Sequence, residues 1–163
     1  MNDLASHSTF NAFESIRKED EIGEYWSARE LSKILSYSDY RNFKDVMRKA
    51  FYAAKNSGQR GKDHFGALTT MVKIGSTASK KIDDVRLSRY ACYLIVQNGD
   101  PSKEIIALGQ TYFAVQTRIQ EIQAMEDYSS LNSEDDRRCF LREQLTKHNK
   151  DLASAAKKGG GRC

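Results

Sequence analysis

The stretch VRLSRYACYLIVQNGDPSKEIIALGQTYFAVQTRIQEIQ, residues 85–123, decides the fold of this chain. Its first part, residues 89–97, is apolar nearly all round, which predicts a helix buried in the core. Ser88 stands where an N-cap residue belongs. Asn98 and Gly99 follow, and this pair predicts that the helix ends with a left-handed residue.

A second helix is expected in the same stretch. Asp100 can cap it, and Pro101, the only proline of the chain, suits its first position. Apolar residues then recur at steps of three and four, which predicts a heptad seam of about five turns. This first seam consists of Ile105, Leu108, Tyr112, Val115, Ile119 and Ile122. Further apolar side chains widen the face, which favours a helix packed within a domain over a plain coiled coil.

The segment before this stretch has weaker signals. Residues 1–11 are small and polar without an apolar period, so we expect a flexible N-terminus. Two short strands of a hairpin are expected at residues 12–18 and 24–27, with Gly23 near the turn. The last turn of a helix is the alternative for residues 13–16.

A helix-turn-helix-like unit is predicted next. Ser27 and Glu30 have the spacing of a capping box, which predicts the start of a helix. Ser38 or Asp39 can then begin a second, basic helix that runs to about Asn56. Two helices joined by a short turn, the second of them basic, have the outline of a helix-turn-helix.

A β-hairpin is expected after these helices. Apolar residues at 71–74 and 82–87 predict two strands, joined by a loop at Ala78–Lys81. Residues 63–69 before them are expected to form a short helical turn. A hairpin that follows a helix-turn-helix is similar to a wing, by analogy alone.

The C-terminal part, residues 127–158, is expected to be a helical segment with a second apolar seam. Asn132 or Ser133 can cap its helix. The leucines of this second seam are Leu141, Leu145 and Leu152. The second seam could lie antiparallel on the first or pack against a partner chain, so a homo-oligomer through either seam stays open. Residues 159–163 are expected to be a disordered tail.

The predicted fold class is therefore α+β, mainly α, with small β-hairpins and long amphipathic helices after the helix-turn-helix-like unit. The 163 residues carry a net charge of +4, with 39% hydrophobic and 29% charged residues, as in a soluble globular domain. No apolar run approaches the roughly 20 residues that span a bilayer, and the N-terminus lacks the order of a signal peptide, so we expect a cytoplasmic protein.

The charges alternate in blocks along the chain. Residues 27–62 hold nine basic and three acidic side chains, and residues 137–163 hold eight and two, a net charge of +6 in each block. Between them, residues 104–136 have one basic and seven acidic side chains. These blocks could pair with one another, or they could present two basic patches to a polyanion.

Candidate contacts to nucleic acid come from the basic helix and the hairpin. Arginine can bind phosphate or guanine through two hydrogen bonds, lysine contacts phosphate, and tyrosine can stack or hydrogen-bond to the backbone. The candidates are Tyr37, Tyr40, Arg41, Lys44 and Arg48 of the helix and Lys73, Lys80 and Lys81 of the hairpin. The alternative for the helix set is a solvated face that balances acidic residues elsewhere, and the alternative for the hairpin lysines is that they serve only solubility.

No motif points to catalysis. The sequence contains no phosphate-binding loop, nucleophile elbow or zinc-protease motif. The three cysteines and three histidines have no metal-ligand spacing, and an odd cysteine count is not a disulfide framework. We therefore expect no catalytic residue, metal or cofactor, and a protein that is not an enzyme.

Three blocks of the sequence resemble the DNA-damage-inducible protein D (DinD) family of bacteria, over roughly residues 12–158. They are RLSRYACYLIVQNGDPSKEIIALGQTYFAVQTRIQE, YWSARELSKILSYSDYRNFKDVMRKA and FLREQLTKHNKDLASAAKK. The second block is also similar to the Bro-N and KilA-N domains of phage and viral proteins, so residues 12–126 are expected to form a Bro-N-like α+β domain.

The resemblance implies a protein of the SOS response to DNA damage that binds DNA and modulates or inhibits the RecA recombinase on its filament. The family continues into a further C-terminal region, whereas this sequence stops at GGGRC, so we expect a C-terminally short member. Two alternatives stay open. One is a phage-type antirepressor or transcription regulator that binds a specific DNA site, and the other is a helical oligomerisation module that binds no DNA.

Overall fold

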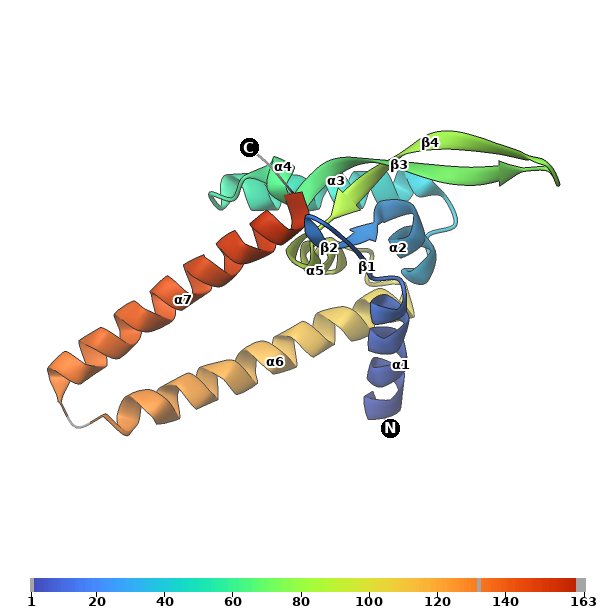
Figure 1. The fold of residues 1–163 in the computed structure, drawn as a ribbon. Helices are drawn as coiled ribbons and strands as arrows, with labels where there is room; N and C mark the ends of the chain where they lie inside the picture. The colour runs from blue at the N-terminus through green and yellow to red at the C-terminus, as the bar shows by residue number, and fades with distance from the viewer. Residues whose placement is uncertain (1, 132, 161–163) are drawn as a thin grey trace.

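The computed structural model describes residues 2–131 and 133–160, and Figure 1 shows a helical body with a long hairpin and two long helices that project from it. The elements of the described residues follow one another as α1 (Asn2–Ser15), β1 (Lys18–Asp20), β2 (Gly23–Ser27), α2 (Ala28–Ile34), α3 (Tyr40–Asn56), α4 (Gly61–His64), β3 (Phe65–Ile74), β4 (Ala78–Leu87), α5 (Arg89–Gln97), α6 (Glu104–Ser129) and α7 (Glu134–Gly160). The prediction of a mainly α member of the α+β class is confirmed.

The four strands form one antiparallel sheet in the order β1-β2-β4-β3. β2 pairs with β4 only where Trp26 and Ser27 face Leu87 and Arg86. β3 and β4 pair over their whole length, from Phe65 opposite Leu87 outward. Most of the β3–β4 hairpin therefore extends beyond the sheet as a two-stranded arm (Figure 1).

The core forms where α2, α3 and α5 meet the base of this sheet. Its largest fully buried apolar side chains are Trp26, Leu31, Phe43, Leu87, Ile95 and Ile106. The predicted buried helix is α5, and its cap is confirmed because the Ser88 side chain accepts a hydrogen bond from the amide of Ala91 at 3.0 Å. Apolar burial of this kind is the main source of folding free energy.

The two helices predicted within residues 27–56 form as α2 and α3, each with a side-chain cap. The side chains of Ser27 and Asp39 accept hydrogen bonds from backbone amides in the first turns of α2 and α3. Between the two helices Ser36 takes a positive φ of 62°, which reverses the chain. Only residues 35–39 separate the two helices, and α3 packs against both α2 and α5.

The link from α5 to α6 differs from the prediction. Asn98 has a φ of −97°, and neither it nor Gly99 is in the left-handed region. Glycine is needed at 99 for space, because a Cβ there would lie 2.9 Å from the side chain of Ile106. α6 begins at Glu104, so Pro101 lies in the preceding turn and does not occupy its first helical position.

The N-terminal segment is helical where we expected a loose segment followed by a strand. α1 ends at Ser15, which fits the helical alternative, and only β1 and β2 form the short hairpin. The physical reason is the contact between α1 and the core. The ring of Phe13 stacks on Trp26 at 4.6 Å, and the indole Nε1 donates to the Phe13 carbonyl at 2.9 Å.

The long hairpin is confirmed, but its turn was misplaced. The expected loop at Ala78–Lys81 is strand, and the turn lies at residues 75–77, where Gly75 has a φ of 66°. A glycine adopts this conformation without strain, which fixes the reversal there. The helical turn expected at residues 63–69 is confined to α4, because β3 begins at Phe65.

The two long helices leave their seams largely uncovered. Ile105 packs against the core, whereas Val115 and Ile119 farther along α6 are 50% and 53% exposed. On α7, Leu141 and Leu145 are 55% and 64% exposed, so the second seam does not lie on the first. α7 runs back toward the body and contacts α4 and β2. Residues 159–160, which were expected to belong to a disordered tail, are part of this helix. Residues 161–163 of the expected tail lie outside the described residues.

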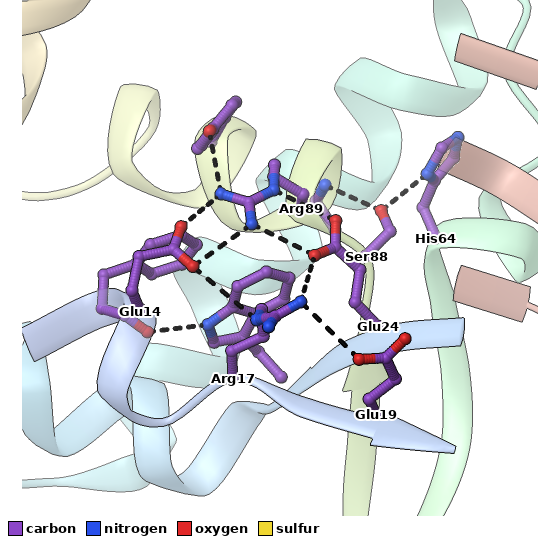
Figure 2. Close-up of polar contacts among 11 residues, drawn as sticks. Glu14, Arg17, Glu19, Glu24, His64, Ser88 and Arg89 are labelled. Atoms are coloured by element: carbon purple, nitrogen blue, oxygen red, sulfur yellow. Dashed lines mark hydrogen bonds and ion pairs between the residues drawn. The ribbon is translucent and has the colours of Figure 1, made fainter. Parts of the chain in front are cut away.

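Two arginines at the corner between β4 and α5 form salt bridges: Arg89 ties α5 to α1 and β2, and Arg86 ties β4 to β1. Arg89 lies between Glu14 and Glu24 (Figure 2), with its Nη1 2.5 Å from Glu14 Oε1 and its Nε 3.1 Å from Glu24 Oε1. Arg86 is nearly buried and pairs with Asp20 at 2.5 Å. Both arginines are therefore held in internal salt bridges. The hydrogen bond from Arg86 holds the pKa of Asp20 at about 2.

Within the described part of the chain, every helix is too short or too polar to cross a membrane.

Candidate nucleic-acid interface

A concave basic surface lies between the start of α3 and the outer part of β4. This surface, which we call the basic hollow, is open and has a volume of about 440 Å³. It is lined by Arg29, Tyr40, Lys44, Lys80, Lys81, Ile82, Asp83, Asp84 and Val85. Four cations and two carboxylates share it, so the basic hollow has a net positive charge.

Tyr40 forms the aromatic side of the basic hollow. The guanidinium of Arg29 lies 4.3 Å from the centre of its ring, and the ammonium of Lys44 lies 5.4 Å from it. Burial, together with the nearby Asp84, raises the pKa of the Tyr40 hydroxyl, which therefore stays protonated and able to donate. The ring thus brings two cations from different helices to one place.

Asp84 fixes the hairpin relative to α2. Its buried carboxylate accepts hydrogen bonds from the side chains of Ser27 and Thr70 and from the amide of Arg29, the last at 3.1 Å. The Arg29 side chain in turn donates from Nε to the Asp83 carbonyl at 2.8 Å. These bonds connect α2, β3 and β4, and Arg29 also lies over the ring of Tyr40 on α3, so the base of the hairpin is held beside both helices.

The basic surface continues along α3 beneath β3. Lys44 and Arg48 also line a second hollow, with Phe51, Phe65 and residues 66–67 of β3 among its walls. Phe51 and Phe65 make part of the wall of this second hollow apolar. The face of α3 that carries Lys44 and Arg48 is therefore the face turned toward the hairpin.

Two arginines of the candidate set form local ion pairs. Arg41 pairs with Asp39 at 3.2 Å, and Arg48 pairs with Asp45. Their side chains are nevertheless 89% and 64% exposed. Exposed pairs of this kind contribute about 0–1 kcal/mol, so a phosphate could replace either carboxylate at little cost.

The structure gathers only some of the predicted residues. Tyr40, Lys44, Lys80 and Lys81 line the basic hollow, and Arg48 adjoins it. Lys73 lies farther out on β3, opposite Ser79. Arg41 is exposed at the start of α3, outside both hollows.

Tyr37 does not belong to this surface. Its side chain is buried, with 8% exposed. Its hydroxyl accepts a hydrogen bond from the amide of Asp100 at 3.2 Å, and the ammonium of Lys103 lies 4.8 Å from the centre of its ring. These contacts attach the turn before α3 to the start of α6. We therefore interpret Tyr37 as a structural residue and leave it out of the interface.

Arg29 is the functional candidate that the sequence missed. It lies on α2, where it is the only arginine, and 54 residues separate it from its partner Asp83. Its charge was counted within the basic block at residues 27–62. Only the three-dimensional pairing of α2 with β4 shows that it belongs with the hairpin lysines.

Polar groups that could suggest catalysis have structural roles. His64 Nδ1 lies 2.7 Å from Ser88 Oγ, but both side chains are fully buried and the serine caps α5 (Figure 2). The Cys92 thiol is free and buried, and burial raises its pKa, which keeps it protonated. Across residues 2–131 and 133–160 no three His, Cys, Asp or Glu side chains are grouped as metal ligands would be.

The fold and this surface define the class as a mainly α, α+β protein with a projecting hairpin and a basic hollow at its base. The chain belongs to the BRO family, since the family's N-terminal domain matches residues 14–114. It is 52% identical over 149 residues to "DNA damage-inducible protein D" of Escherichia coli (strain K12), which confirms the resemblance found in the sequence. That match covers 91% of this chain but 54% of the relative, so the chain spans about half the relative's length. No solved structure matched the chain.

Proposed function

We propose that this protein is a non-enzymatic regulator of the bacterial response to DNA damage and that it binds duplex DNA through the basic hollow. One observation carries the proposal. Lys44 of α3 and the pair Lys80 and Lys81 of β4 are far apart in sequence but line one concave surface, which Arg29 completes. A concave cluster of cations matches the convex, negatively charged backbone of a duplex.

The interface we propose contacts mainly phosphates. Lysines bind phosphate as point charges and carry little sequence information, whereas Arg48 could also reach a base edge. Arg41 and Lys73 flank the basic hollow and would extend the contact along α3 and the arm. Each phosphate neutralised on a duplex adds about 0.9 to the slope of log affinity against log salt, so binding should weaken steeply with salt.

The name of the relative supports a place in the damage response, and the family resemblance suggests the partner. We propose that the protein acts in the bacterial cytoplasm on the RecA recombinase filament, where it modulates or inhibits the recombinase. The exposed seams of α6 and α7 supply apolar surface for a protein contact. A RecA strand-exchange assay on this chain tests the proposal, and an unchanged rate at saturating protein would refute it.

Fluorescence anisotropy with a labelled duplex tests the DNA contact. The variant Lys44→Ala/Lys80→Ala/Lys81→Ala should reduce the salt slope by about 2–3, because it removes three phosphate contacts. The matched control is Arg142→Ala/Lys147→Ala/Lys150→Ala, which removes the same charge from exposed positions of α7. Equal losses in the two variants would contradict the proposed interface.

A site-specific regulator of the phage antirepressor type is the second candidate, favoured by the exposed arginine at 48 on the hairpin face of α3. Competition binding with random and selected duplexes distinguishes this site-specific regulator from a protein that contacts mainly phosphates. A site-specific protein should prefer its site by roughly 10³ or more, whereas a phosphate-binding protein should show little preference.

The third candidate is a helical oligomerisation module that uses the exposed seams and binds no DNA. Light scattering measures its mass in solution. An oligomer that shows no DNA binding at low salt would favour this module over the basic hollow.

A further inference from the structure

The outer part of the β3–β4 hairpin, residues 70–82, is an exposed arm with an unusual composition. Met71, Val72 and Ile74 are 56%, 40% and 53% exposed, although all three are large and apolar. Thr70, bonded to Asp84 at 2.6 Å, ties the start of the arm to the body of the protein. At about 3.4 Å per residue, Ile74 lies roughly 14 Å beyond Thr70.

The strand register sorts the arm into two faces. Residues directly opposite each other point to the same side of a sheet, and Val72 pairs with Lys80 while Ile74 pairs with Ala78. These four residues therefore share one face, and we call its apolar members, Val72, Ile74 and Ala78, the apolar tip. Met71 lies on the other face, opposite Lys81.

The charge of the arm indicates which partner the apolar tip contacts. Residues 70–82 contain three lysines and no acidic side chain. A second copy of the arm would bring the same three positive charges against them, which opposes pairing of two arms. The lysines attract a polyanion such as DNA. The stacked bases inside DNA are apolar, so they offer the exposed apolar side chains of the arm a matching surface.

We propose that the apolar tip is a wedge that enters the minor groove of duplex DNA and bends it. Ile74, at the turn, would insert between two base pairs, while Lys73, Lys80 and Lys81 would hold the flanking phosphates. The minor groove is about 7.5 Å deep, which is within the reach of the arm. Apolar wedges of this kind bend DNA by about 20–90°. The inference rests on the proposed DNA binding and specifies what the arm adds to it.

Two readouts on one duplex separate the wedge from the binding itself. Anisotropy reports affinity, and energy transfer between dyes at the two ends of a 30-base-pair duplex reports bending. Wild-type protein should bring the ends together, while Val72→Ser/Ile74→Ser should bind within about tenfold of wild type and leave the duplex straight. Met71→Ser, on the opposite face, should bend DNA as wild type does.

The outcomes distinguish the two ideas. Wild-type binding without any change in energy transfer, as expected for an arm that lies in the major groove, would overturn the wedge and leave the basic hollow intact. Full bending by Val72→Ser/Ile74→Ser would overturn it as well. Absence of wild-type binding would refute the proposed function and the wedge together. Because the substituted side chains are exposed, equal melting temperatures of the variants should accompany the expected result.

Discussion

His64 is a fully buried histidine whose Nδ1 lies beside Ser88 Oγ and whose Nε2 has no hydrogen-bond partner among the side chains that the structure describes. Burial lowers the pKa of this imidazole below its ordinary value of 6.5, although the nearby Asp63 opposes the effect. The neutral ring is therefore the form that the fold accommodates. A proton on it would bring a positive charge into the core where α4 meets α5, a cost that the nearby Asp63 offsets only in part.

This burial predicts the pH dependence of stability. The unfolded chain takes up a proton on His64 at a higher pH than the folded chain, so the free energy of unfolding is greatest above about pH 6.5. It should fall as the pH drops through the lower, folded pKa. Urea melts at several pH values between 5 and 8 measure the effect, and His64→Gln should flatten the profile. A wild-type profile that is level across this range would contradict the assignment.

For single residues, the sequence predicted those roles that depend on neighbours close in the chain. The caps at Ser27 and Ser88 were predicted from their side-chain chemistry and spacing, and the cap of α3 was narrowed to Ser38 or Asp39, of which the structure shows Asp39. The role of Gly99 was misassigned, because its lack of a side chain serves contact with Ile106 on the next helix. Such a requirement comes from packing and leaves no local pattern.

At the scale of elements, α6 combines a core segment with a projecting one. Ile106 is fully buried, whereas Ile119 is 53% exposed on the same helix. The heptad pattern is continuous through both segments, so periodicity alone could not show where burial stops. Likewise, the apolar residues that predicted the β3–β4 hairpin could not locate its turn, because residues 78–81 are small or polar and exposed, which suits a strand of the arm as well as a loop.

This division predicts different effects for two chemically equal substitutions. Ile106→Ala should destabilise the protein by about 2–5 kcal/mol, since it leaves a cavity in the core. Ile119→Ala should change stability by less than about 1 kcal/mol, since solvent already reaches that side chain. Urea denaturation of the two variants makes the comparison. A cost at Ile119 that equals the cost at Ile106 would show that the outer segment of α6 is covered by a partner in solution.

On the scale of the whole molecule, the candidate interface is a product of topology. The basic helix and the hairpin lysines were each identified from the sequence, but as separate patches. The antiparallel sheet and the bonds to Asp84 bring them together, and add Arg29 from α2. Charge blocks in a sequence do not specify which blocks meet in space, which is why this part of the site required the structure.

The contact between the basic hollow and DNA is the central claim, and protection of individual lysines tests it most directly. The protein is acetylated with and without a duplex at low salt, and mass spectrometry gives the reactivity of each lysine. We predict that the duplex protects Lys44, Lys80 and Lys81 several-fold and leaves Lys147 and Lys150 of α7 unchanged. Protection confined to α7, or equal reactivity of all lysines with and without DNA, would contradict the account.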